Sequence, residues 1–216
     1  MSDVHIVEQG EHLSQIAKFY GFPDYKILWD HPENADLKKL RKNPNILFSG
    51  DEVFVPDKEE KEESGSTDKR HTFIVDKETL KLCLVLEDVY EKPIAGAQCA
   101  LLVDGQVFQL TTDGHGKIEQ EIPLDAKEGV LTIRGVQTPF ANEVIPIKIG
   151  HLDPVEEISG QVARLNNLGY FAGDLDGSDS DAFESAVEEF QCDHGLKVDG
   201  DCGPKTQSKL KEIHGC

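Results

Sequence analysis

A run of residues without a single apolar side chain interrupts this chain, reading DKEEKEESGSTDKR at positions 57–70. Such a segment has nothing to bury in a core, and its charge, glycine and serine content is typical of a flexible linker. We therefore expect a folded region over residues 1–57, a flexible charged linker over 58–70, and further folded regions after it.

Residues 1–57 place helical spacing between two short strands. Ile6 and Val7 begin a strand, and residues 53–55 form a closing strand that ends at Pro56. Between them, apolar residues recur at i, i+3, i+4 and i+7, which is the spacing of one helix face. A second, unusually long helical region is expected to follow. The first face consists of Leu13, Ile16, Ala17 and Tyr20, and the second region carries Ile27, Leu28, Trp29, Leu37 and Leu40.

Two motifs frame this region, VEQGEHLSQIA at 7–17 and NPNILFSGD at 43–51. Together they resemble a LysM domain, which implies a βααβ fold that binds glycans containing N-acetylglucosamine, such as peptidoglycan. The resemblance also implies that the loops after the first strand and before the last hold the glycan. An alternative for Leu13 and Leu47 is that they are core residues. The implied contacts are Gly10, Glu11, His12 and Leu13 on one side, and Asn45, Ile46, Leu47 and Phe48 on the other.

After the linker the hydrophobic period changes to two, the spacing of half-buried strands. Asp104-Gly105 predicts a tight hairpin between two of the apolar runs. The short strands predict an antiparallel β-sandwich over residues 71–150. The segments PIAGA at 93–97 and TDGHG at 112–116 resemble the pre-albumin-like carboxypeptidase-regulatory sandwiches. The candidate strands are residues 72–75, 80–86, 98–103, 106–110, 117–122, 130–133 and 142–149.

Residues 151–216 return to helical spacing and predict three helices. Phe183 is expected to lie in the core, because it begins an i, i+3, i+4, i+7 series, and Pro204 suits a first helical turn. The three apolar faces are Ile158, Val162, Leu165 and Leu168; Phe183, Ala186, Val187 and Phe190; and Thr206, Leu210 and Ile213.

The same region carries VARLNNLGY at 162–170, followed by Asp176-Gly177, Phe190-Gln191 and VDG at 198–200. This series resembles the three-helix peptidoglycan-binding domain that is often appended to cell-wall hydrolases. The resemblance implies a second candidate glycan site at Tyr170, Asp176 and Gly177. The whole chain is also similar to LysM and peptidoglycan-binding accessory proteins of type VI secretion or phage-like contractile systems.

The net charge of −19 comes with no basic stripe, so neither nucleic acid nor an anionic membrane is an expected partner. The N-terminus has neither a basic segment nor an apolar one of the signal-peptide kind. We therefore expect synthesis in the cytoplasm without a signal peptide, and action at the periplasm or cell wall after non-Sec delivery.

No motif for catalysis, a metal or a cofactor stands out. His-Glu-x-x-His, Cys-x-x-Cys and Gly-x-Ser-x-Gly are absent, and no segment is left over for a catalytic domain. The acids between residues 174 and 184 fail the calcium-loop spacing and favour a helix N-terminus instead. His151 and Asp153 are expected to form an interdomain joint. The five cysteines are expected to be reduced, although Cys192 and Cys202 flank one loop and could form a disulfide.

These observations predict a non-catalytic, multivalent peptidoglycan binder. The modules would act together on a polymeric ligand through avidity, and the β-sandwich would serve as a spacer or bind a secretion or tail-spike protein. One alternative is an adaptor or structural protein of a contractile injection apparatus. The other is a cell-wall hydrolase, which would need a pair of positioned carboxylates.

Overall fold

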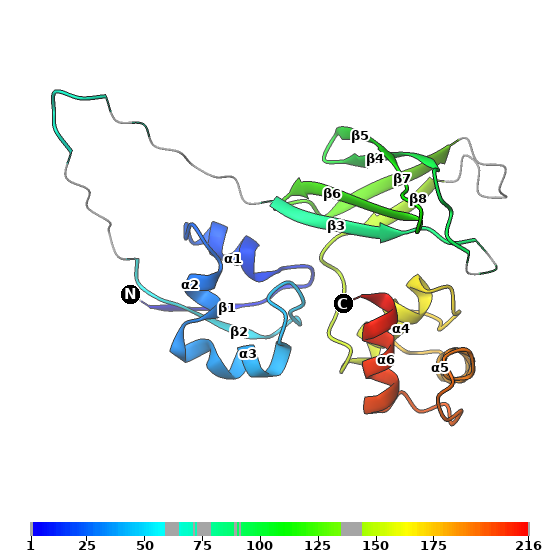
Figure 1. Ribbon diagram of the computed structural model, residues 1–216. Coiled ribbons are helices and arrows are strands. Elements are labelled where there is room, and N and C mark those ends of the chain that lie inside the picture. Colours follow the sequence, from blue (N-terminus) through cyan, green and yellow to red (C-terminus); the bar gives the residue numbers. More distant parts are fainter. Residues whose placement is uncertain are drawn as a thin grey trace. The chain divides into compact units, whose positions relative to one another are not determined.

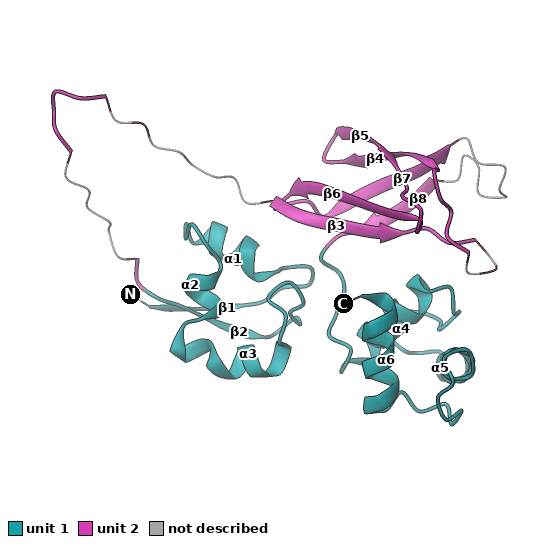
Figure 2. Cartoon of the chain, viewed as in Figure 1, with its two compact units in different colours: residues 1–56, 150–216 teal, residues 57–149 magenta. Residues whose placement is uncertain are grey.

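The computed structural model describes residues 2–58, 65–70, 72, 79–88, 90, 92–134 and 144–215 (Figure 1). The chain divides into two compact units (Figure 2): unit 1 contains residues 1–56 and 150–216, and unit 2 contains residues 57–149. Parts of three expected segments lie outside the described residues, namely 59–64 of the linker, 73–75 of the first candidate strand and 142–143 of the last. No helix in the described ranges has both the length and the apolar content needed to span a bilayer.

The N-terminal module of unit 1 is a two-stranded antiparallel sheet with helices between its strands. Asp3 lies opposite Val55, and Ile6 opposite Glu52. The expected long second helical region is broken at His31, because the proline that follows favours an extended conformation there. The elements are β1 (Asp3–Ile6), α1 (Leu13–Phe19), α2 (Lys26–Trp29), the 3-10 helix η1 (Pro32–Asn34), α3 (Ala35–Arg41) and β2 (Glu52–Val55).

The core of this module is built from most of the helix faces that the sequence predicts, but Ile27 and Leu40 of the second region are exposed, at 41% and 58%. Leu13, Ile16, Leu28 and Val53 are almost completely buried. The side chain of Asn34, 2% exposed, completes the fold from within. Its Nδ2 donates to the carbonyls of Leu28 and Phe54, both at 2.8 Å, and its Oδ1 accepts from the Phe54 amide at 2.8 Å. The side-chain amide of Asn34 thus forms hydrogen bonds with backbone groups of both α2 and β2.

Unit 2 consists of two antiparallel sheets around one hydrophobic core. The order of the larger sheet is β5-β4-β7-β8, and β3 pairs with β6 in the smaller one. The predicted hairpin at Asp104-Gly105 is confirmed: Val103 pairs with Gln106, and both turn residues have positive φ, as a two-residue type I′ turn requires. The strands are β3 (Thr79–Val85), β4 (Gln98–Val103), β5 (Gln106–Thr111), β6 (Lys117–Pro123), β7 (Glu128–Arg134) and β8 (Val144–Lys148).

The chain is thus a mixed α and β protein with antiparallel sheets, as expected. The LysM identity of the N-terminal module and the sandwich identity of unit 2 stay predictions.

The C-terminal module of unit 1 has the three expected helices, α4 (Ile158–Asn167), α5 (Ser180–Asp193) and α6 (Pro204–His214). Phe190 and Leu210 lie at the centre of its core, and Phe183 packs against that core with part of its ring exposed. Pro204 occupies the first turn of α6, where its missing N–H costs nothing. Cys192 and Cys202 are free thiols, so the disulfide alternative is not realised.

Candidate functional site

A single side chain organises the loop between α5 and α6. Gln191, 1% exposed, accepts from the amides of Asp199 (2.8 Å) and Gly200 (3.1 Å). The Nε2 group of the same side chain donates to Asp199 Oδ1 at 2.9 Å, to the Asp201 carbonyl at 3.0 Å and to Thr206 Oγ1 at 3.1 Å. The Phe-Gln and Val-Asp-Gly motifs of the sequence are therefore the two halves of one hydrogen-bond network.

The second candidate glycan site proves to be largely structural. Tyr170 is 8% exposed, donates to Asp193 Oδ2 at 3.1 Å and packs edge-on against Phe190. Asp176 accepts from the Ser178 amide at 2.9 Å, and hydrogen bonds from Ser178 lower the pKa of this carboxyl. Gly177 has φ +67°, and a Cβ there would meet Ile158 at 2.6 Å. Of the three, only Asp176 presents an exposed side chain.

Next to this turn lies an exposed aromatic side chain that the sequence analysis did not single out. Phe171 is 79% exposed, although its neighbour Tyr170 is buried. Leu175, on the same loop, is 44% exposed. The same loop therefore carries two exposed apolar side chains and the exposed carboxylate of Asp176. Hydrophobic periodicity could not reveal it, because Phe171 lies outside the helices.

The two predicted glycan loops of the N-terminal module lie side by side, since the Leu13 amide donates to the Pro44 carbonyl at 3.0 Å. Three of the eight predicted contacts, His12, Leu13 and Leu47, are buried, at 4%, 0% and 5% exposure. The side chains of Leu13 and Leu47 belong to the core, which is the alternative that the sequence left open. His12 caps α1 through Nδ1. The five others keep exposed atoms and stay predicted contacts: Gly10, Glu11, Asn45, Ile46 and Phe48.

A buried ion pair holds the second of these loops in place. Arg41 donates from Nε and Nη2 to the two carboxylate oxygens of Asp51, at 2.8 and 2.9 Å. Asp51 also accepts from the Phe48 amide at 2.9 Å, and the guanidinium lies 5.5 Å from the centre of the Phe48 ring. The hydrogen bond to Asp51 is the main cause of the raised pKa of Arg41. The Arg41–Asp51 pair thus holds the loop through the bond from Asp51 to the Phe48 amide.

Within unit 1, the first loop meets the segment that leads into the C-terminal module, the junction (residues 150–157). A Cβ on Gly150 would lie 2.6 Å from the Gly10 carbonyl oxygen, and one on Gly10 would lie 3.2 Å from His151 Nε2. Gln9 donates to Asp153 Oδ1 at 3.0 Å. Within unit 1, His151 and Asp153 thus contact the N-terminal module, and their role as an interdomain joint stays a prediction.

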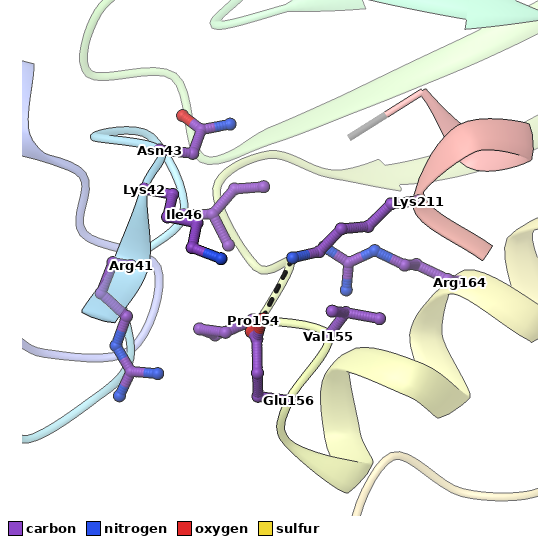
Figure 3. A pocket seen from close by; sticks show the side chains of 9 residues that line it. All are labelled: Arg41, Lys42, Asn43, Ile46, Pro154, Val155, Glu156, Arg164 and Lys211. Carbon is purple, nitrogen blue, oxygen red and sulfur yellow. Dashed lines mark hydrogen bonds and ion pairs between the residues drawn. The ribbon is translucent and has the colours of Figure 1, made fainter. Parts of the chain in front are cut away.

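A pocket of about 270 Å³ lies between α3, the second loop, the junction and α6 (Figure 3). Four cationic side chains and one acidic side chain line it: Arg41, Lys42, Arg164, Lys211 and Glu156. The Lys42 and Lys211 side chains reach toward each other across the pocket, whereas the guanidinium of Arg41 points away. Lys211 pairs with Glu156 at 3.1 Å.

Within the described ranges, no group of three or more His, Cys, Asp or Glu side chains could hold a metal ion. Burial raises the pKa of the Cys202 thiol to about 11, so this buried sulfur is a protonated core group rather than a nucleophile.

Comparison with known proteins agrees with the geometry of the C-terminal module. Residues 162–210 match a family model described as a putative peptidoglycan binding domain. The match runs from α4 through α5 into α6 and includes both halves of the Gln191 network. No curated protein and no solved structure matches the chain. The LysM resemblance and the similarity to contractile systems have no such support, so it is the C-terminal module that carries the likeness to a peptidoglycan-binding domain.

Proposed function

We propose that this protein binds peptidoglycan without cleaving it. The observation that carries the proposal is the match of residues 162–210 to a putative peptidoglycan binding domain. The fold supports it, because the matched motifs have a coherent structural role around Gln191. The pocket of Figure 3 has one acid among four cations, whereas glycoside hydrolysis would use a pair of positioned carboxylates.

On the C-terminal module, we place the glycan at the loop that carries Phe171. An aromatic ring offers a large flat contact for the apolar face of a sugar. Asp176, on the same loop, offers carboxylate oxygens to sugar hydroxyls. A ring that is 79% exposed is free to make this contact, whereas the buried ring of Tyr170 supports the loop from beneath.

The test is co-sedimentation of the full chain with insoluble sacculi. Phe171→Ala should weaken binding about fivefold, which is typical of removing an aromatic ring from a contact surface. Phe19→Ala is the matched control, because Phe19 is 78% exposed and lies on the N-terminal module away from its predicted glycan loops. An intact protein that stays entirely in the supernatant would refute the proposal. Equal losses in the two variants would remove Phe171 from the site.

The N-terminal module would add a second, weaker contact with the same polymer. Two modules on one chain raise each other's effective concentration, so avidity can exceed either affinity without any new contact. The predicted contacts that remain exposed, among them Asn45 and Phe48, would line this second contact.

An adaptor role in a contractile injection apparatus is the second candidate. The acidity of the C-terminal region favours it: residues 150–216 hold 14 acids against five Lys and Arg. Such a surface would suit a basic protein partner. A protein that does not bind sacculi but does bind a basic protein would support this candidate. Clearing of sacculi in a zymogram would instead support a hydrolase.

A further inference from the structure

The pocket of Figure 3 has an unusual charge for this molecule. The chain carries 41 acids and 22 Lys and Arg, yet the pocket is lined by four cations and one acid. Arg41 is neutralised by Asp51 and has Glu157 3.6 Å from its Nη1. Arg164 is fully buried and donates to the carbonyls of Asp153 and Gly160. The two lysines are therefore the cations that a ligand can reach.

Glu156 is the one acidic side chain that lines the pocket with these two lysines. Its carboxylate pairs with Lys211 at 3.1 Å. Burial tends to raise the pKa of Glu156, but its own backbone amide, Lys211 and Lys42 together hold it below its ordinary value. In the described part of the chain, no carboxylate lies within ion-pair distance of the Lys42 ammonium, so two positive charges face one negative charge.

The backbone at Lys42 adds a second observation. Lys42 has φ +58° at the end of α3, where glycine is the usual residue. A side chain with a Cβ is disfavoured in this left-handed conformation, and such residues gather at functional sites. The chain therefore keeps a lysine at a position where glycine would be less strained, and this lysine lines the pocket.

The pocket is also continuous with the predicted glycan loop of the N-terminal module. Ile46 belongs to both, being a predicted glycan contact and a lining residue. Pro154 and Val155 add apolar groups to the lining of the pocket. A ligand that lies along the loop and ends in the pocket would thus present a neutral part first and an anionic part last.

We infer that Lys42 and Lys211 bind a carboxylate of a glycan-linked peptide, so that the N-terminal and C-terminal modules form one composite site for peptidoglycan with its peptide stem. This inference rests on the proposed function and names the part of the polymer that the junction recognises. A neutral polymer of N-acetylglucosamine carries no such group and gains nothing from the pocket.

The experiment compares two soluble probes by calorimetric titration of the full chain: a disaccharide-tetrapeptide, and the same fragment with its carboxylates amidated. The wild-type protein should bind the acidic fragment roughly tenfold more tightly, as expected for a charge-assisted hydrogen bond. Lys42→Gly and Lys211→Gln should each lose this preference while still binding the amidated fragment as the wild type does. Lys42→Gly relieves the left-handed strain, so misfolding cannot explain its loss.

Lys39→Gln serves as the charge-matched control, since Lys39 lies on α3 with a 78% exposed side chain and does not line the pocket. It should keep the preference of the wild type. Equal affinity of the wild type for the two probes would overturn this inference and leave the proposed function standing. Failure of the wild type to bind either probe would also overturn this inference, whereas the proposed function is refuted only if the protein does not co-sediment with sacculi.

Discussion

At the scale of single residues, buried side-chain amides bond to the backbone at the ends of helices and strands and in loops. Asn34 bonds to Leu28 and Phe54 in the N-terminal module, and Gln191 bonds to the loop before α6 in the C-terminal one. Buried backbone groups without partners cost roughly 1–3 kcal/mol each, so replacing either amide by an apolar residue would leave several such losses. These positions hold the loops on which the candidate sites are built.

His214 should make the stability of unit 1 depend on pH. Burial, and then the charge of Arg164, lower its pKa to about 4. Asn167 Nδ2 lies 3.1 Å from its Nε2, which suits a neutral imidazole that accepts. An unfolded chain binds this proton at an ordinary pKa near 6.5, so stability is complete above about pH 6.5 and is lost as the pH falls toward 4, by about 1–2 kcal/mol once solvent screening of this half-buried side chain is allowed for.

Urea denaturation between pH 7 and pH 4 measures this loss. His214→Gln retains a polar side chain without the titration, so its stability should change less over the same interval. A variant with the same pH dependence as the wild type would show that another group is responsible.

At the scale of elements, the sequence predicts the helices and turns whose formation depends on local residue spacing. The faces beginning at Leu13 and Phe183 and the Asp104-Gly105 hairpin are found where expected, because each depends on local spacing or turn chemistry. The break at His31 was missed, since its effect comes from the following proline. Phe171, Lys42 and Arg41 could not be recognised as parts of sites, because exposure, left-handed backbone and long-range pairing leave no periodic trace.

Helix α5 allows a test of whether Phe183 has a structural role. Its ring packs against the C-terminal core but is only partly buried. Phe183→Thr should therefore cost about 1–2 kcal/mol, less than for a fully buried ring, and lower the melting temperature by about 5 °C. Phe183→Leu, which keeps an apolar contact, should lose less. Unchanged melting together with stronger sacculus binding would mean that this ring covers a glycan site.

At the scale of the whole molecule, unit 2 is inserted between the two segments of unit 1. The two segments of unit 1 are therefore distant in sequence and must pack against each other for the unit to be compact. The Gly10 and Gly150 approach, the bond from Gln9 to Asp153 and the pair between Arg41 and Glu157 supply that packing. The modules at the two chain ends therefore share one compact unit, and we expect them to unfold together, although their motifs differ.

Differential scanning calorimetry should accordingly resolve two unfolding transitions rather than three. Leu28→Ala in the N-terminal core and Leu210→Ala in the C-terminal core should lower the same transition, because both fully buried residues belong to unit 1. Leu131→Ala, equally buried in unit 2, should lower the other. Each truncation removes about 2–5 kcal/mol, enough to shift its transition by at least about 5 °C. If Leu28→Ala and Leu210→Ala moved different transitions, the junction would be too weak to couple the modules, and the composite site would have to form only when the ligand draws them together.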